Sequence, residues 1–294
     1  MQPSSKLPIS CPLPENARTM RWRVLSKTSR TNGDREGAAS FPTLWRCTCV
    51  SVFVLLFIIL WQAVIWVMHL ESWLLPSPYD VITGFGRADT QAILKIDLWP
   101  TVDEALIGFA LAVAGGVALA AAMNLSRLFR TGMYPLLIAS QAVPTIAIAA
   151  VLVVLFGYGL APKVVVVFLF CFFSVTVNVD DAIRDLDPEL PQLLRTLGAS
   201  RWYIFRVAGL PSALPGLFTG ARLAATYCVA AAVYGEWVGA TGGLGYGLQM
   251  ASYQNDQTLV FDLVLVMALL GIGAFTALTL LERLCIPWAP RQRS

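Results

Sequence analysis

Residues 50–70 read VSVFVLLFIILWQAVIWVMHL and lie in a longer stretch, between Arg46 and Glu71, that contains no Asp, Glu, Lys or Arg. The hydrocarbon core of a bilayer is about 30 Å thick, and a helix that rises about 1.5 Å per residue crosses it with about 20 residues. Residues 50–70 therefore predict a transmembrane helix, and they set the length against which other apolar stretches can be compared.

The whole chain has the composition of a membrane protein. Of its 294 residues, 57% are hydrophobic and 13% are charged, whereas soluble domains have roughly 45–50% apolar and about 25% charged residues. Apolar stretches of similar length recur along the chain, and they predict an all-α polytopic membrane protein with about six transmembrane helices. The expected spans are residues 50–70, 105–124, 136–157, 164–179, 214–235 and 260–281.

The distribution of charge predicts the domain layout and the orientation. Residues 1–43 are rich in Pro, Ser, Arg and Lys and lack apolar periodicity, so we expect a disordered tail before a transmembrane domain at 44–289 and a short tail at 290–294. Lys and Arg accumulate in cytoplasmic loops. With the amino terminus inside, only Arg87, Lys95 and Lys163 fall in outer loops. Both termini should therefore be cytosolic, with residues 71–104 outside and residues 180–211 inside.

Several classes of function find no support in the sequence. The net charge is +3 without a basic aromatic cluster, which argues against nucleic-acid binding. The six scattered cysteines are interpreted as small hydrophobic residues, because Cys47-x-Cys49 lacks the spacing and the second ligand pair of a zinc site. A membrane-bound enzyme is disfavoured because there is one histidine and no nucleophile–base set beside the spans.

Glycines indicate where the backbone packs tightly. Gly108, Gly115 and Gly116 in the second span suit close helix packing, and five glycines between Gly239 and Gly247 suggest tight turns or close backbone contacts.

The most polar internal segment, about residues 185–211, predicts two short helices that meet at a turn. Gly198 permits the bend, and the Ser200 side chain can cap the second helix. Apolar residues repeat at helical spacing on both sides of the bend. They are Leu193, Leu194 and Leu197 before it, and Trp202 and Phe205 after it. Such a surface predicts docking on a partner protein; the alternative is an amphipathic hairpin that lies on the lipid interface.

This segment resembles the ATPase-coupling loop of the permeases of binding-protein-dependent ABC transporters. The family pattern is Glu-Ala-Ala, three residues, Gly, nine residues, Ile, one residue and Leu-Pro. Here Gly198 is followed at the same spacing by Leu210-Pro211, whereas Gln192-Leu193-Leu194 replaces Glu-Ala-Ala and Ala208 replaces Ile. The residues that the resemblance assigns to coupling are Gln192, Leu193, Leu194, Leu197, Gly198, Ala199, Ser200, Arg201, Trp202 and Phe205.

Flanking motifs are similar in kind and order to one subfamily, the permeases for nitrate, sulfonates, taurine and thiamine-precursor pyrimidines. These motifs are LPSP at 75–78, LGASRW at 197–202, LPG at 214–216, GARLA at 220–224, Glu236 and GLGY at 243–246. The resemblance covers about residues 50–288, and it implies the fold of a type I ABC importer permease with a cytosolic coupling-helix loop.

The resemblance implies a set of partners and a small solute. Cytosolic ABC ATPase subunits would bind ATP and Mg²⁺, an external binding protein would deliver the solute, and a second copy of this chain would complete the pathway in a prokaryotic inner membrane. This chain itself should be a translocation subunit without a cofactor, because it has no phosphate-binding loop with adjoining Gly-Lys-Ser/Thr. The competing function is a stand-alone secondary transporter or channel, although inverted repeats are not detectable.

Four polar or kink-forming residues in the spans are candidates for the translocation pathway. Arg222 and Glu236, fourteen residues apart, lie on roughly the same helix face. The alternatives are an Arg222 side chain that reaches the cytosolic headgroups and a Glu236 that packs helices or lies at the outer end. Gln141 and Pro144 predict a kink with an exposed amide, although Gln141 could equally bond another helix.

Overall fold

The computed structural model describes residues 43–187 and 189–286, and within these ranges all regular structure is helical. The chain divides into two compact units at Leu60 and Trp61, inside the first described helix, α2 (Thr43–Met68). The predictions for the tails at 1–42 and 290–294 lie outside the described residues.

Long apolar helices account for most of the described chain. They are α2, α4 (Ala88–Leu125), α7 (Leu160–Arg184), a continuous helix at Arg201–Gly239 and α12 (Gln257–Cys285). The pair α5 (Arg127–Ser140) and α6 (Thr145–Phe156) also passes as apolar enough, with a bend of 98° between its halves. The described chain therefore holds five candidate spans, or six if the bent pair counts as one, which confirms the predicted all-α fold with about six membrane helices.

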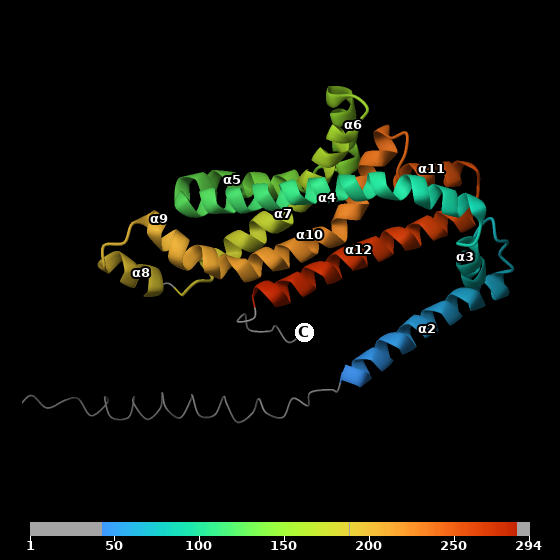
Figure 1. Ribbon diagram of the computed structural model, residues 1–294, viewed down its shortest axis with the longest axis horizontal. Coiled ribbons are helices and arrows are strands. Elements are labelled where there is room, and N and C mark those ends of the chain that lie inside the picture. Colours follow the sequence, from blue (N-terminus) through green and yellow to red (C-terminus); the bar gives the residue numbers. More distant parts are fainter. Residues whose placement is uncertain (1–42, 188, 287–294) are drawn as a thin grey trace, which may run out of the picture. The chain divides into compact units, whose positions relative to one another are not determined.

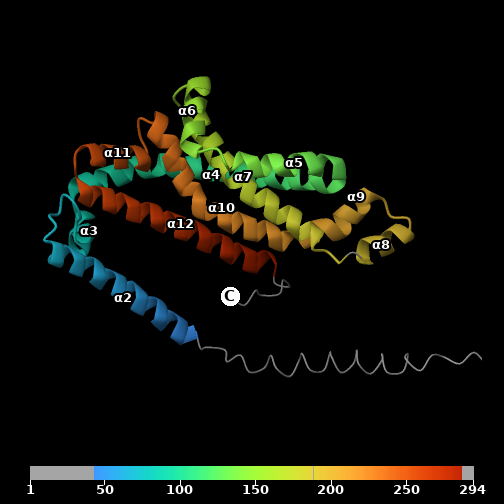
Figure 2. The same ribbon diagram turned by 180° about the vertical axis from the view of Figure 1, so that it is seen from behind.

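Between Trp61 and Ile286, α7 packs between α4 and α10 (Leu210–Gly239), and α12 lies along α10 (Figures 1 and 2). The contact between α4 and α7 depends on glycine. A Cβ at Gly108 would lie 2.5 Å from Cβ of Val167, and one at Gly116 would lie 2.9 Å from Cβ of Val175. Because glycine has no Cβ, the two backbones can approach closely. The predicted role of these glycines in helix packing is confirmed.

The third predicted span is broken. In place of one helix at 136–157, α5 ends at Ser140 and α6 begins at Thr145, with Gln141 and Pro144 in the connection. Pro144 occupies the N-cap of α6, where its missing N–H costs no helical hydrogen bond. Figures 1 and 2 show α6 turning away from the line of α5. The kink at these two residues was predicted, but its size was not.

The prediction that the first outer loop reaches residue 104 is wrong, because helix begins well before that residue. It contains the short helix α3 (Pro78–Gly84), whose N-terminus has a capping box in which Ser77 and Asp80 bond each other's backbone N–H. The next helix, α4, already begins at Ala88 and runs past Asp97 and Glu104. Spans were expected to stop at charged residues, whereas this helix continues through them because its polar side chains are bonded inside the protein.

Candidate functional site

The segment predicted to couple to an ATPase forms a bend between α8 (Glu189–Thr196) and α9 (Arg201–Ile204). Gly198 has φ +82°, the left-handed conformation that glycine adopts without strain. Its N–H donates to the Arg195 carbonyl at 2.9 Å, and the Ala199 N–H donates to the Leu194 carbonyl at 3.0 Å. These two bonds form a Schellman motif, which satisfies the last carbonyls of α8 and reverses the chain. The predicted bend at Gly198 is confirmed.

Ser200 begins the second helix as predicted. Its Oγ accepts a hydrogen bond from the Tyr203 N–H at 3.2 Å, so the side chain satisfies one of the free donors of the first turn. We call residues 189–204 the α8–α9 bend.

The second helix is not a separate short element, and this part of the prediction is wrong. From α9 the chain continues through the π-helical turn η1 (Phe205–Gly209) into α10, so that residues 201–239 form one helix. The loop therefore ends at Ser200 and not near Pro211. In η1 the Leu210 N–H donates to the Phe205 carbonyl. Such a turn changes the hydrogen-bond register just before Pro211, which has no N–H to donate.

Most of the predicted coupling residues lie on the surface of the bend. Leu193, Leu197 and Trp202 are 57%, 75% and 59% exposed. Gln192, Gly198, Ser200 and Arg201 are exposed as well, whereas Leu194 and Ala199 are half-buried.

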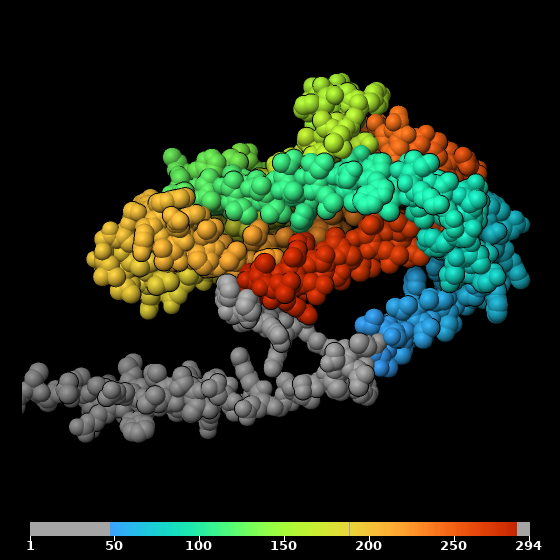
Figure 3. Space-filling model, viewed as in Figure 1, coloured from blue at the N-terminus to red at the C-terminus, as the bar shows by residue number. Residues whose placement is uncertain are grey.

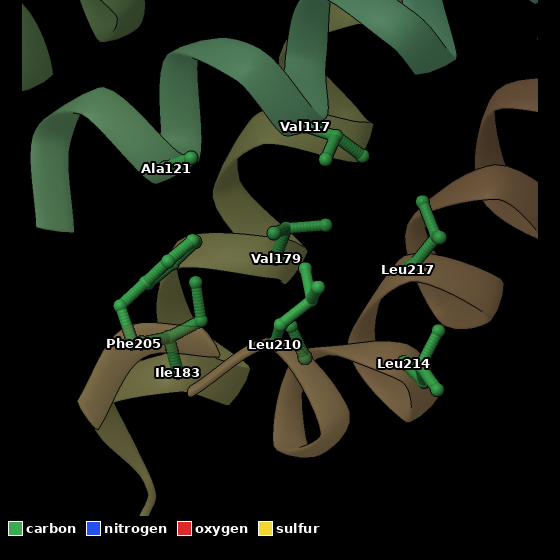
Figure 4. Close-up of a pocket in the computed structure, with 9 residues that line it drawn as sticks. Val117, Ala121, Val179, Ile183, Phe205, Leu210, Leu214 and Leu217 are labelled. Carbon is green, nitrogen blue, oxygen red and sulfur yellow. The ribbon is translucent and has the colours of Figure 1, made fainter. Parts of the chain in front are cut away.

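Phe205 is the exception. It is 7% exposed, its ring stacks on Trp202 at 5.7 Å, and its other contacts are in the protein core. Figure 4 shows its side chain among those of Ala121 on α4 and Ile183 on α7. The expectation that Phe205 belongs to the exposed docking surface is therefore wrong. Although Phe205 follows Trp202 by about one helical turn, its ring lies between Trp202 and the helices behind the bend, and not in solvent.

At the opposite end of α10, a hydrogen-bond network fixes the N-terminus of α11 (Leu244–Tyr253). The Gly243 N–H donates to Asp97 Oδ1 at 2.9 Å, and the Leu244 N–H donates to Thr101 Oγ1 at 2.8 Å. Both acceptors belong to α4. The first N–H groups of a helix have no partners within it, so side chains of a neighbouring helix satisfy them here.

Glu236 completes this network from α10. It is 1% exposed, its Oε1 accepts from Thr101 Oγ1 at 2.6 Å, and its Oε2 accepts from the Gly245 N–H at 2.5 Å. A Cβ at Gly243 or Gly245 would collide with this carboxylate, which accounts for the glycines that the sequence places here. The geometry agrees with the packing alternative for Glu236, and its place on the pathway stays a prediction.

A buried ion pair lies beside Glu236. Lys163 Nζ contacts Glu104 Oε1 at 2.6 Å, with side-chain exposures of 10% and 3%. The pair joins α7 to α4. The assignment of Lys163 to an outer loop is wrong, because the residue lies inside α7 and its charge is neutralised by a carboxylate from the neighbouring helix.

The remaining pathway candidates are accessible to different degrees. Arg222 donates from Nη1 to Glu282 Oε2 at 2.5 Å, which links α10 to α12, and both side chains are about four-fifths buried at 23% and 20% exposure. Gln141 and Pro144 are exposed at the break between α5 and α6. The four candidates therefore do not form one cluster, and their roles on the pathway stay predictions.

The sequence alone does not reveal the partners of these charges. The predicted spans stop next to Glu104, Lys163 and Asp180, but these three residues, like Asp262, are buried inside helices. A charged residue inside an apolar helix does indicate a partner within the protein, because its charge must be paired there. Spacing within one helix cannot show which residue of another helix is that partner. Within the described ranges, no group of three or more His, Cys, Asp or Glu side chains could hold a metal ion.

Comparisons with known proteins identify the fold and the family. The structure is similar to a chain of the methionine ABC transporter MetNI in inward-facing conformations, with a TM-score of 0.60 and 21% identity, covering 67% of this chain and 98% of that chain. At this identity the likeness concerns the fold alone. The family model for the binding-protein-dependent transport system inner membrane component matches residues 112–286.

Named relatives match most of the chain. The formylaminopyrimidine transport permease protein ThiX of Halalkalibacterium halodurans is 34% identical over 82% of this chain and 96% of its own length. The riboflavin transport system permease protein RibX of Chloroflexus aurantiacus is 33% identical over 83% and 91%. The putative aliphatic sulfonates transport permease protein SsuC of Escherichia coli is 31% identical over 78% and 88%. With this fold, this family match and these relatives, the chain belongs to the binding-protein-dependent transport system inner membrane component family, the permease subunits of ABC importers.

Proposed function

We propose that the ATPase binds to the α8–α9 bend and that its conformational change is transmitted to this permease through the bend. The chain is a translocation component of an ABC importer, and its family implies a separate ATPase and a substrate-binding protein as partners. The observation that carries the proposal is the Schellman bend at Gly198, which presents Leu193, Leu197 and Trp202 to solvent.

The chemistry of the bend favours a protein partner over a lipid surface. None of the residues of α8 is buried. An isolated eight-residue helix is too short to be stable alone, so a docked partner would stabilise it. The bend is also joined without a break to a span of 39 residues. A partner that moves the bend can therefore tilt the 201–239 helix as a rigid body, and such motions switch packed bundles between two states.

Leu197→Asp tests the coupling role. It places a charge in the most exposed apolar position of the bend, and we expect loss of ATPase from the purified complex together with loss of ATP-dependent uptake. Leu284→Asp is the matched control, because Leu284 is 78% exposed in the last turn of α12. Gly198→Pro, which cannot adopt φ +82°, should have the same effect as Leu197→Asp. If both bend variants kept the ATPase bound and transport coupled, the assignment would be wrong.

We propose that the transported solute is a small heteroaromatic compound rather than a sulfonate, taurine or nitrate. Two relatives at 34% and 33% identity are named for formylaminopyrimidine and riboflavin transport, and the relative named for aliphatic sulfonates is 31% identical. Arg222 is the pathway candidate whose charge would suit an anion, but it already pairs with Glu282. Uptake of labelled pyrimidine and of labelled alkanesulfonate into cells with the complete transporter would separate the two classes. Uptake of the sulfonate alone would contradict the proposal.

We also propose that two copies of the chain form the pathway in the inner membrane, with both termini in the cytosol. Val154, Leu155 and Phe156 at the end of α6 are 86%, 69% and 59% exposed in the single chain, and a second copy could cover part of this apolar surface. Co-purification of two differently tagged copies tests the pairing. Reporter enzymes fused to each terminus test the orientation, and activity of an external reporter at either end would overturn it.

A further inference from the structure

Beside the α8–α9 bend lies a polar groove of about 760 Å³, which we call the arginine groove. It is bounded by the end of α4, the start of α5, the end of α7 and the bend itself. Figure 3 shows α4, α5 and the bend side by side at one end of the second unit. Its charged lining residues are Arg127, Arg130, Arg184, Arg195, Arg201 and Asp180. The volume lies within the usual range for small-molecule sites, about 300–1,000 Å³.

The groove carries an excess of positive charge. Arg130 is the one arginine of this set that makes an ion pair among the described residues, and its partner is Asp180. The acidic residues nearby in sequence, such as Asp181, Asp185 and Glu189, make no ion pair with the groove arginines in the described ranges. Several guanidinium groups around one concave surface repel each other and concentrate a positive potential, which an anion would relieve.

Asp180 supplies a second, independent sign of a ligand. Its side chain is fully buried. Arg130 Nε donates to Asp180 Oδ2 at 2.9 Å, and Arg130 Nη2 lies 2.8 Å from the same oxygen. The other oxygen, Oδ1, is buried without a hydrogen-bond partner in the described part of the chain. An unpaired buried carboxylate oxygen is costly. The groove therefore lacks both an anion for its arginines and a donor for Asp180.

A small apolar cleft of about 30 Å³ adjoins the groove. It is lined only by apolar side chains, among them Val117, Leu214 and Leu217 (Figure 4). Ile183 and Phe205 line both the cleft and the groove, so the polar and apolar spaces share a wall. Both lie where α4 and α7, two membrane-crossing helices, come to an end. The cleft has room for about one small group and not for an acyl chain, so what suits a lipid is the position of the groove at the ends of these helices.

We propose that the arginine groove binds the phosphate-bearing headgroup of a membrane phospholipid, whose phosphate contacts the arginines and whose hydroxyl or ammonium donates to Asp180 Oδ1. Arginine binds phosphate through its planar fork of N–H donors. Basic pockets between membrane helices bind lipid headgroups on general electrostatic grounds. The position of the groove, where two membrane-crossing helices end, favours a phospholipid over a soluble phosphate compound. This proposal requires only the groove itself and does not depend on the role of the bend in coupling.

The test uses the complete transporter in detergent, stripped of lipid and titrated with phosphatidylglycerol, with bound lipid counted by native mass spectrometry. The Arg127→Gln/Arg184→Gln variant removes two groove charges that are absent from the predicted coupling surface. We expect binding at least about tenfold weaker, since the loss of even one charge-assisted hydrogen bond has an effect of that size. The matched control is Arg206→Gln/Arg283→Gln, which removes two exposed arginines outside the groove and should bind as the wild type does.

Further arms make the result decisive. Arg127→Lys/Arg184→Lys keeps the charge and should recover part of the binding, which separates loss of the site from loss of folding. Asp180→Asn should weaken retention of a headgroup with an ammonium or hydroxyl. Competition by glycerol phosphate as effective as that by lipid would assign the same phosphate site to a soluble compound and overturn the lipid assignment. Equal lipid binding by the wild type and both glutamine variants would overturn the proposal. If Arg127→Gln/Arg184→Gln lost the ATPase and kept its lipid binding, the groove would be a site for the ATPase and the proposal would also be overturned.

Discussion

Lys163 Nζ lies 2.6 Å from Glu104 Oε1 between α7 and α4, and the two side chains are 10% and 3% exposed. Removal of one partner leaves an uncompensated charge in the interior. We therefore expect Lys163→Met to lower the free energy of unfolding by about 3–5 kcal/mol, as for other broken buried pairs. Unfolding of the purified permease in mixed micelles, followed by tryptophan fluorescence, would measure the change.

The double variant Glu104→Gln/Lys163→Met is the control for this pair. It removes both charges, so most of the lost stability should return, because replacing a whole buried pair by neutral residues is often close to neutral. If the double variant were as unstable as the sum of the single ones, Lys163 and Glu104 would not act as a pair.

Gly245 is the position where an added methyl group should be most informative. A Cβ there would lie 2.7 Å from Glu236 Oε2 and 3.0 Å from the Val233 carbonyl oxygen. Because both atoms are held in the packed contact between α10 and α11, Gly245→Ala should lower the free energy of unfolding by about 1–3 kcal/mol, the usual cost of overpacking.

The matched control is Gly273→Ala in α12, where a Cβ would meet no atom within 4 Å. In a helix interior, alanine is favoured over glycine by up to about 1 kcal/mol. The two substitutions should thus have opposite signs in the same unfolding measurement. A stabilising Gly245→Ala would show that Glu236 does not hold the N-terminus of α11.

Much of the fold could be predicted from apolar stretches, because length and composition determine which segments cross a bilayer. The bend at Gly198 and the cap at Ser200 could also be predicted, since glycine in the left-handed conformation and serine at an N-cap act within a few residues of themselves. The break at Pro144 was predictable for the same reason. Its 98° angle was not, because the packing of α6 on other helices determines the angle.

The partners of the buried charges could not be predicted in this way. Glu236 bonds Thr101, 135 positions away, and Lys163 bonds Glu104 across 59 positions. Such pairs depend on which helix faces meet and at what height. A single sequence specifies periodicity within each helix, but it gives no relative rotation or shift between two helices. The same reason explains why Phe205 was assigned to the surface of the bend, although it packs against α7.

Asp256 offers a test by pH at the beginning of α12, outside the membrane-crossing helices. Its side chain bonds Arg87 through two hydrogen bonds at 3.1 and 2.7 Å, and it also accepts from the Leu259 N–H at 3.1 Å. The hydrogen bonds from Arg87 lower the pKa of Asp256 below its ordinary value of 3.8. A group whose pKa falls on folding stabilises the folded state above its unfolded pKa, and this contribution disappears as the pH falls through the folded pKa.

We therefore compare the melting temperature of the wild type with that of Asp256→Asn between about pH 7 and pH 3. Asparagine keeps the N-cap but cannot ionise, and other groups near Arg87, such as Asp89, are the same in both proteins. The wild type should be the more stable protein above about pH 4, by at most about 1 kcal/mol because Arg87 is 42% exposed and the pair is screened by solvent. The difference should shrink as Asp256 becomes protonated at lower pH. A difference that stayed constant across this range would show that Asp256 does not depend on its charge to hold Arg87.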